Sequence, residues 1–270
     1  MKQFLKYPGS KYKSADWIIR QFPEHHSYLE PFFGSGAILF NKKRSDIETV
    51  NDIDGEVINL FRQIKEVPQA IEKEIYFLPY SREIYEAAFE GMPKNDLERA
   101  INFIIRSNMG HGYKTNGKKV GWKCDVQGRE KAYAAQEWAA LPGIIGEVAE
   151  RLKGVQIENR PAVELIRKYN FDNVLIYADP PYLLSTRTGE QYRYEMTEQD
   201  HEELLKALKT HIGPVVISGY DSEMYNDVLQ NWQKEIKTSY AMSGKKRTEV
   251  IWCNRPELCR QYTLFDNGDK

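Results

Sequence analysis

An acid, two prolines and a tyrosine follow one another at the end of a short apolar run, as Asp179, Pro180, Pro181 and Tyr182. The prolines donate no N–H and hold φ at about −65°, which leaves the carbonyl oxygens of the acid and the first proline as outward acceptors. Such acceptors beside an aromatic ring suit a flat heterocycle with an exocyclic amine. The stretch therefore predicts a catalytic site for an amino-bearing base. The alternative interpretation is a proline-stiffened turn with an acid at a helix start.

A glycine turn lies near the start of the chain. Residues 28–40 predict a strand, a turn and a helix, and Gly34 and Gly36 let the backbone of that turn approach a ligand closely. A second predicted strand, 47–50, is followed by Asp52, roughly 20 residues beyond the glycines, where an acid can bind ribose hydroxyls. The full G-x-G-x-x-G fingerprint is absent. The pattern therefore favours an adenosine-containing ligand over a pyrophosphate, although such a turn alone more often serves packing.

A Pro-Gly turn precedes a helix that we expect over residues 14–21. Gly9 and Ser10 can present backbone N–H groups at the start of that helix, and Lys11 can reach a carboxylate. An ordinary turn before a surface helix is the alternative.

These candidate residues require an α/β core to bring them together. The run 173–178 is too short and too rich in β-formers for a helix, so it predicts a buried parallel strand with Asp179 at its carboxyl end. That end of an open α/β sheet is where ligands bind. We expect further strands over 155–158, 214–218, 236–240 and 248–253, and helices over 162–169, 197–210 and 221–229.

The alternation of strands and helices stops in the middle of the chain, where helical patterns take over. We therefore expect a catalytic domain formed by residues 1–58 and 153–270, with residues 59–152 inserted into it. The helices expected in this part of the chain cover 57–64, 82–89, 96–107 and 136–151.

A basic, aromatic hairpin is predicted inside the insertion. Asn116-Gly117 is typical of a type I′ turn, and Tyr113 and Trp122 flank it. A β-ribbon of this kind is of a size to enter a DNA major groove and contact phosphates, whereas a solvated hairpin with ordinary lysines is the alternative. The candidate DNA contacts are Lys114, Asn116, Lys118, Lys119 and Lys123.

A polar segment, 183–196, follows the Asp-Pro-Pro-Tyr stretch and contains Arg187 and Arg193. It has little apolar anchoring, so we expect a lid that orders over substrate or nucleic acid, with both arginines as further DNA contacts. Thr197 and Asp200 after it resemble a capping box at a helix start.

The composition sets broad limits. The 270 residues carry a formal net charge of −1, from 38 Lys and Arg against 39 Asp and Glu, so any affinity for DNA must come from local patches. The three cysteines, Cys124, Cys253 and Cys259, form no CxxC pair or metal-ligand spacing, which predicts reduced thiols in a cytosol and no metal site. No apolar run approaches membrane length, and no signal peptide is recognisable.

Four motifs, in this order, together resemble the Dam-type alpha group of DNA adenine-N6 methyltransferases: 6–11, 30–36, 51–54 and 179–182. The resemblance implies a Rossmann-like core that binds S-adenosylmethionine, with the insertion placed where that family carries its target-recognition domain. It also implies a mechanism in which a flipped adenine stacks on Tyr182 and donates its N6 hydrogens to Asp179 and the Pro180 carbonyl, without a metal. The implied cofactor contacts are Tyr7, Gly9, Lys11, Glu30, Phe32, Gly34, Gly36, Asp52 and Asp179.

The chain departs from the family pattern in two places. Residues 159–162, Asn-Arg-Pro-Ala, replace a loop in which many members have an acid, so the group that holds the cofactor's adenine is left open. The hairpin lacks the Arg-Tyr-x-x-Asn-Gly pattern of GATC-reading members, so that target is not inferred. Cytosine N4, an RNA substrate and an inactive DNA-binding protein with the same fold are the alternatives that we weigh.

The C-terminal tail resembles the peptide by which proteins bind the bacterial sliding clamp, through Gln261, Leu264 and Phe265. A tail that docks on its own domain is the alternative. The resemblance as a whole implies the cytoplasm of a bacterium or of a phage-infected host.

Overall fold

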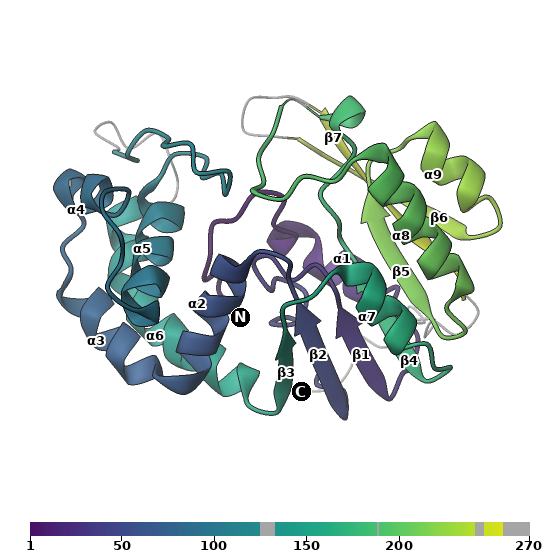
Figure 1. The fold of residues 1–270 in the computed structure, drawn as a ribbon, viewed down its shortest axis with the longest axis horizontal. Helices are drawn as coiled ribbons and strands as arrows, with labels where there is room; N and C mark the ends of the chain where they lie inside the picture. The colour runs from purple at the N-terminus through teal and green to yellow at the C-terminus, as the bar shows by residue number, and fades with distance from the viewer. Residues whose placement is uncertain (125–132, 188, 241–245, 256–270) are drawn as a thin grey trace, which may run out of the picture.

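The computed structural model describes residues 1–124, 133–187, 189–240 and 246–255. Its centre is a seven-stranded sheet in the order β3-β2-β1-β4-β5-β7-β6 (Figure 1). β7 pairs antiparallel with both of its neighbours, and every other pair is parallel. The predicted α/β core is thus confirmed. The strands are β1 Ser27–Glu30, β2 Ile47–Asn51, β3 Val155–Glu158, β4 Val174–Ala178, β5 Val215–Gly219, β6 Gln233–Tyr240 and β7 Lys246–Cys253.

Both faces of the sheet are covered, which explains the unbroken apolar run of β4. Leu175 and Tyr177 point into one buried cluster, and Val174, Ile176 and Ala178 point into a second one on the opposite face. The chain continues from β1 to β2 and β3 on one side and places β4 and β5 on the other side. The order of the strands therefore reverses between β1 and β4, and a ligand site is expected at their carboxyl ends.

The helices fall into two groups (Figure 1). One group packs around the sheet, and its α8 begins with the expected capping box of Thr197 and Asp200. The other group forms the helical part drawn at the left of Figure 1. Around the sheet lie α1 Ala15–Ile19, α7 Ala162–Lys168, α8 Glu198–Thr210 and α9 Glu223–Val228, and the helical part contains α2 Gly55–Glu66, α3 Pro68–Phe77, α4 Arg82–Ala87, α5 Asp96–Met109 and α6 Ala134–Leu152.

The helical part shares a core with the sheet. α2 runs through the predicted boundary at residues 58 and 59, and Phe61 on this helix packs against Phe4 and Phe33, with ring centroids 6.4 and 4.7 Å away. The division into a catalytic domain and an inserted domain stays a prediction. α3 was not predicted; Pro68 starts it, and Ile71 and Ile75, four residues apart, bury one side.

Two local predictions were wrong. The glycine turn leads into further turns over residues 37–41 and not into a regular helix: the Phe40 N–H donates to the Gly36 carbonyl and the Lys42 N–H to the Ile38 carbonyl, but these bonds do not continue as a series along the chain. Residues 110–124 form a loop closed by one bridge, Gly110 to Trp122, and not a regular β-ribbon.

The tip of this loop pairs with a distant segment. The Thr115 N–H donates to the Gln191 carbonyl at 2.9 Å, and the Asn116 side chain donates to the Glu190 carbonyl at 3.4 Å. These bonds replace the cross-strand pairing of the expected hairpin. The loop after α5 and the segment 183–196 therefore meet beyond the carboxyl ends of the central strands (Figure 1).

No helix within the described ranges is long and apolar enough to cross a membrane. Among the same residues, no group of three or more His, Cys, Asp or Glu side chains is arranged to hold a metal ion. Cys124 is an exposed free thiol, Cys253 is buried on β7, and Cys259 lies outside the part of the chain that the structure describes.

Candidate active site

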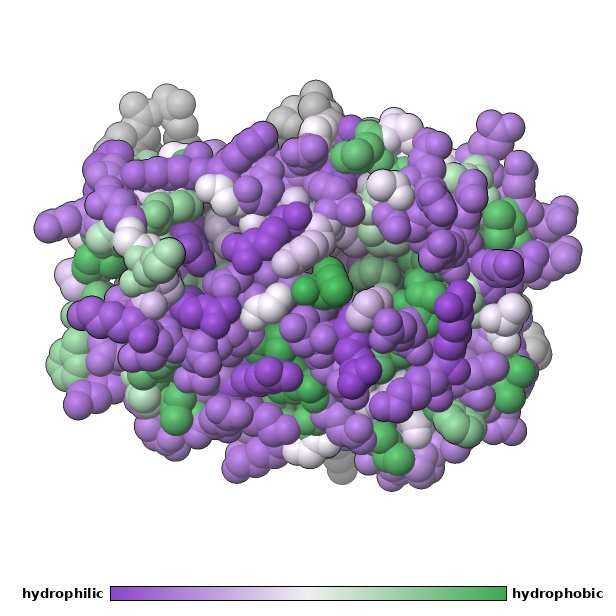
Figure 2. Space-filling view, in the orientation of Figure 1, coloured by the Kyte–Doolittle hydropathy of each residue, from purple (hydrophilic) through white to green (hydrophobic). Residues whose placement is uncertain are grey.

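A cavity of about 390 Å³ opens at the point where the strand order reverses. Its volume is within the range of small-molecule sites. The exposed face around it is mainly hydrophilic, with hydrophobic residues gathered near the centre (Figure 2). The predicted site residues that line the cavity are Tyr7, Gly9, Lys11, Glu30, Phe32, Gly34, Asp52, Asp179, Pro181 and Arg193, whereas Gly36, Pro180 and Tyr182 are not part of the lining.

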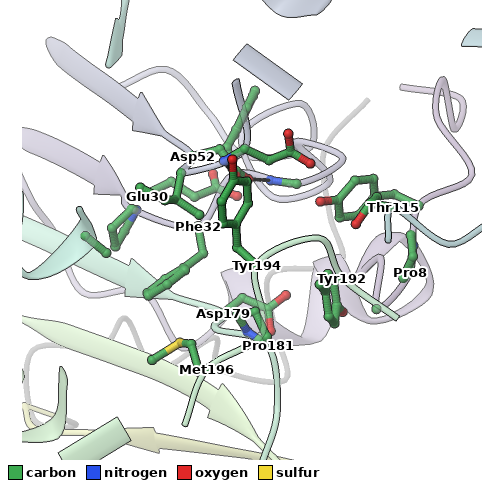
Figure 3. A pocket seen from close by; sticks show the side chains of 18 of the residues that line it. Pro8, Glu30, Phe32, Asp52, Thr115, Asp179, Pro181, Tyr192, Tyr194 and Met196 are labelled. Atoms are coloured by element: carbon green, nitrogen blue, oxygen red, sulfur yellow. Dashed lines mark hydrogen bonds between the residues drawn. The ribbon is translucent and has the colours of Figure 1, made fainter. Parts of the chain in front are cut away.

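Asp52 holds the glycine turn at one end of the cavity. Its carboxylate accepts from the Gly34 N–H at 2.8 Å and from the Asp54 N–H at 2.9 Å. Burial raises the pKa of Asp52 to about 6, although these two N–H groups oppose the shift. Gly34 is required there, because its φ is +48° and a Cβ would lie 3.1 Å from the Tyr7 ring. Figure 3 shows Asp52 and Asp179 on different sides of the same space.

Glu30 is a second buried acid in the lining, at 2% exposure. It ends β1 and accepts a hydrogen bond from the Tyr28 hydroxyl at 2.8 Å. Burial raises the pKa of Glu30 to about 8, even though the bond from Tyr28 opposes the shift. At neutral pH this carboxyl is therefore mostly protonated without a ligand, and a cation in the cavity would favour its ionised form.

Glu30→Gln should remove a pH dependence of stability. Between its ordinary value of 4.5 and about 8, the folded chain keeps the Glu30 proton while the unfolded chain releases it, so the free energy of unfolding falls as pH rises. We expect wild type to lose about 2–3 kcal/mol relative to Glu30→Gln between pH 5 and pH 8, in denaturant titrations. The exposed Glu24→Gln should run parallel to wild type, and a parallel course for Glu30→Gln would contradict the assignment.

Asp179 stands at the carboxyl end of β4, as predicted, with one oxygen held from two sides. Lys11 Nζ lies 3.0 Å from Oδ1, and the Ser218 hydroxyl donates to the same atom at 2.8 Å. Burial raises the pKa of Asp179, Lys11 opposes the shift and Glu249 adds to it. Burial also disfavours the charged form of Lys11, but Asp179 and Glu249 outweigh it, so the net effect raises the pKa of Lys11. The result is an ion pair inside the protein with one carboxylate oxygen already engaged.

Tyr182 and Glu249 complete this corner. The Tyr182 hydroxyl donates to Glu249 Oε1, which also lies 3.3 Å from Lys11 Nζ. Sequence reasoning missed Ser218 and Glu249. Ser218 was within reach, because the parallel register pairs Ala178 with Ile217 and so places the next residues of β4 and β5 side by side.

Residues 189–196 cross the cavity and supply Tyr192, Tyr194 and Met196 to its lining (Figure 3). Arg187 anchors this segment internally: its side chain is 7% exposed, donates to the Tyr182 carbonyl at 2.8 Å and pairs with Glu195. The guanidinium is thus engaged within the protein, and nothing in this arrangement supports the predicted DNA contact. Arg193 is 43% exposed and lies 3.6 Å from Asp54.

The family model of the D12 class N6 adenine-specific DNA methyltransferases matches residues 7–244, a stretch that contains the glycine turn, Asp52 and the Asp-Pro-Pro-Tyr motif. This chain belongs to that family. It is an adenine-specific DNA methyltransferase, as the four ordered motifs predicted, and the family favours adenine N6 over the alternative of cytosine N4.

Curated relatives agree over nearly the full length. The DNA adenine methylase of Vibrio cholerae is 27% identical over 269 residues, which cover 92% of this chain and 93% of the relative. The DNA adenine methylase of Salmonella typhimurium is 26% identical, with 92% of each chain covered. The type II methyltransferase M1.LlaDCHI of Lactococcus lactis is 24% identical, with 94% of this chain and 95% of the relative covered.

The departure at residues 159–162 has a structural role in this methyltransferase. Asn159 donates from its side chain to the carbonyl of Asp52 at 2.7 Å, and the Arg160 N–H donates to the Asn51 side chain at 2.9 Å. This loop therefore holds the backbone that carries Asp52. Residues 161–163 present an apolar wall to the cavity.

The loop after α5 exposes only part of the predicted basic set of the methyltransferase. Lys118 and Lys119 are exposed, whereas Lys114 and Lys123 are half-buried. Asn116 accepts from the Lys118 N–H at 3.2 Å, which orders the tip.

Proposed function

We propose that this methyltransferase transfers the methyl group of S-adenosylmethionine to N6 of an adenine flipped out of duplex DNA. The observation that carries the proposal is the shared cavity: Asp179, fixed by Lys11 and Ser218, lines the same space as the glycine turn and Asp52. A carboxylate that can accept from an amine and a turn suited to an adenosine are thereby placed within one small-molecule site.

The lining fits S-adenosylmethionine. A ligand with a sulfonium and an ammonium group would stabilise the ionised form of Glu30, which the protein itself leaves buried and mostly protonated. Asp52 can accept from ribose hydroxyls, and Phe32 with residues 161–163 offers apolar contact for an adenine ring. When bound, this cofactor supplies an electrophilic methyl group. The residues that we propose to hold it are Tyr7, Gly9, Lys11, Glu30, Phe32, Gly34 and Asp52, with Asp179 at the methyl end, whereas Gly36 shapes the turn without lining the cavity.

The reaction at Asp179 follows from its contacts. The adenine has to leave the duplex because its amine is otherwise buried in pairing and stacking. Asp179 and the Pro180 carbonyl would accept the two N6 hydrogens, which exposes the nitrogen lone pair for in-line attack on the methyl carbon, while Tyr182 stacks on the base. The N–C bond forms as the C–S bond of the sulfonium breaks to leave a neutral thioether, and the proton that N6 then loses would pass to Asp179 or to water. Lys11 and Ser218 favour the ionised form of the carboxylate against the effect of burial, and they orient it at Oδ1. Orientation of this kind can supply roughly 7–11 kcal/mol of the barrier reduction.

We assign target recognition to residues 59–152. The exposed Lys118 and Lys119, and Arg193 on the segment that crosses the cavity, are available to DNA phosphates. Lys114, Asn116 and Lys123 complete the proposed DNA-facing set at the same loop.

The test is methyl transfer from labelled S-adenosylmethionine to unmethylated bacterial DNA, followed by analysis of the nucleosides. We expect N6-methyladenine as the labelled product. N4-methylcytosine would move the assignment to the exocyclic amine of cytosine. Methylation of RNA without methylation of DNA would overturn DNA as the substrate.

We further propose that the tail binds the sliding clamp through Gln261, Leu264 and Phe265, residues that lie outside the described ranges. A glutamine followed by an adjacent Leu-Phe pair suits an apolar cleft on a partner. Immobilised clamp should retain the native chain and lose the double variant Leu264→Ala/Phe265→Ala. Equal recovery of the two chains would end the idea.

A further inference from the structure

Glu249 brings a second carboxylate to the catalytic corner. It lies on β7, its side chain is 20% exposed, and Oε1 contacts both the Tyr182 hydroxyl and Lys11 Nζ. A second carboxylate beside the lysine that pairs with Asp179 costs free energy, because both acids are partly desolvated and carry like charge. Glu249 raises the pKa of Asp179, after the larger effect of burial and against the opposite effect of Lys11. A role that outweighs this cost is to be expected.

We propose that Glu249 is a positioning residue for methyl transfer, which fixes the Tyr182 ring through its phenol and shares Lys11 with Asp179. This inference rests on the proposed function, in which the Tyr182 ring and the Asp179 carboxylate both contact the target adenine.

The Tyr182 ring is fixed from three directions. Its hydroxyl is held by Glu249, Lys11 Nζ lies 4.6 Å from the ring centroid, and Tyr220 packs against it in a T-shaped contact with centroids 4.6 Å apart. Lys11 covers one face of the ring, so a base would stack on the other face. A ring held in this way loses little entropy when the base arrives.

Charge balance is the second contribution of Glu249. One cation, Lys11, is shared by two carboxylates, so the three groups carry a net charge of −1. The amine nitrogen becomes more positive as it attacks the methyl group, and a fixed negative environment stabilises that change. Without Glu249, Lys11 would neutralise Asp179 alone and weaken it as an acceptor.

Three variants separate the two contributions. Glu249→Gln keeps an oxygen for the Tyr182 hydroxyl but removes the charge. Tyr182→Phe removes the hydroxyl but keeps the ring, and Glu249→Ala removes both contributions. The matched controls are Glu235→Gln and Glu235→Ala on the neighbouring β6, because Glu235 lies opposite Ile251 and contacts Gln233 instead of the catalytic corner. Melting temperatures for all variants establish that each one folds.

We expect Glu249→Ala to lower kcat by about 10- to 100-fold on saturating unmethylated DNA, with KM for S-adenosylmethionine changed by less than about threefold. Tyr182→Phe should also lower kcat. The double variant Tyr182→Phe/Glu249→Ala should be little worse than Glu249→Ala, because both changes remove the same contact. If the fold-losses in kcat of the two single variants multiply in the double variant, Glu249 does not act through the Tyr182 hydroxyl. A kcat of Glu249→Ala equal to that of Glu235→Ala would overturn the proposal as well.

The pH profile gives a readout that a merely structural role would not move. Protonated Asp179 is a weaker acceptor for the amine hydrogen and no longer carries the negative charge, so the acid limb of kcat follows its ionisation. Glu249→Gln removes a like charge, and the acid limb should move to lower pH, whereas Tyr182→Phe should leave it in place. The titratable and charged groups that interact with Asp179 are Lys11, Glu30, Tyr177, Tyr182, Tyr192, Tyr225 and Glu249.

An acid limb of Glu249→Gln that coincides with wild type would overturn the charge contribution, even if Glu249→Ala fails to fold. The wild-type chain in the same assay reports on the proposed function. If it forms no N6-methyladenine, both proposals fall, whereas an active wild type with unchanged Glu249 variants overturns this inference alone.

Discussion

Asp179→Asn is expected to lower kcat by about 10³-fold, while the affinity for S-adenosylmethionine changes by no more than about tenfold. The amide keeps the size of the carboxylate but loses its charge, and its NH2 group can only donate. A donor facing the N6 hydrogens opposes the pull that exposes the nitrogen lone pair. Of the two carboxylates that Lys11 contacts in the native chain, Asp179 and Glu249, only Glu249 would remain in this variant. Single-turnover rates and equilibrium binding of the cofactor measure the two effects separately.

The control for this prediction is Asp227→Asn, the same chemical change on an exposed residue of α9. It should match wild type in both measurements. A variant at Asp179 that keeps more than about a tenth of the wild-type rate would remove this carboxylate from the reaction. Loss of cofactor binding in parallel with the rate would instead mean that Asp179 acts through the cofactor site.

Asp179 could be found from the sequence because its signal is local. Five consecutive buried residues on β4 require cover on both faces of the sheet, and the acid that ends such a strand has to stand at the ligand edge. The same argument, carried one strand further, would have found Ser218 from the register of β4 and β5.

Glu249 could not be found in this way. Chain order suggests β6 as the neighbour of β5, but β7 inserts antiparallel between them, so the strand that faces the catalytic corner is known only from the structure. The loop tip at Asn116 shows a similar limit. Its Asn-Gly signal is local, whereas Thr115 pairs with Gln191, more than seventy residues away in the chain, and this tertiary pairing decides the local conformation.

Gly36→Ala is expected to be the most damaging small change in the glycine turn. The backbone at Gly36 has φ +67°, and a Cβ there would lie 2.3 Å from a Phe40 ring atom and 2.7 Å from a Phe33 ring atom. Neither ring can move aside easily, because Phe61 packs against both: its ring centroid lies 4.7 Å from that of Phe33 and 5.8 Å from that of Phe40. Backbone strain of about 1–2 kcal/mol adds to overpacking of about 1–3 kcal/mol, so the free energy of unfolding should fall by about 2–5 kcal/mol.

Gly91→Ala separates these two terms. Gly91 has a similar φ of +74°, but nothing lies within 4 Å of its added Cβ, so only the backbone strain should appear, at about 1–2 kcal/mol. Urea titrations of both variants therefore measure the packing term at Gly36 by difference. Equal losses would mean that the turn tolerates a side chain and that Gly36 is present for its backbone alone. A larger loss at Gly36, together with weaker binding of S-adenosylmethionine, would show that the packed rings set the shape of the cofactor turn.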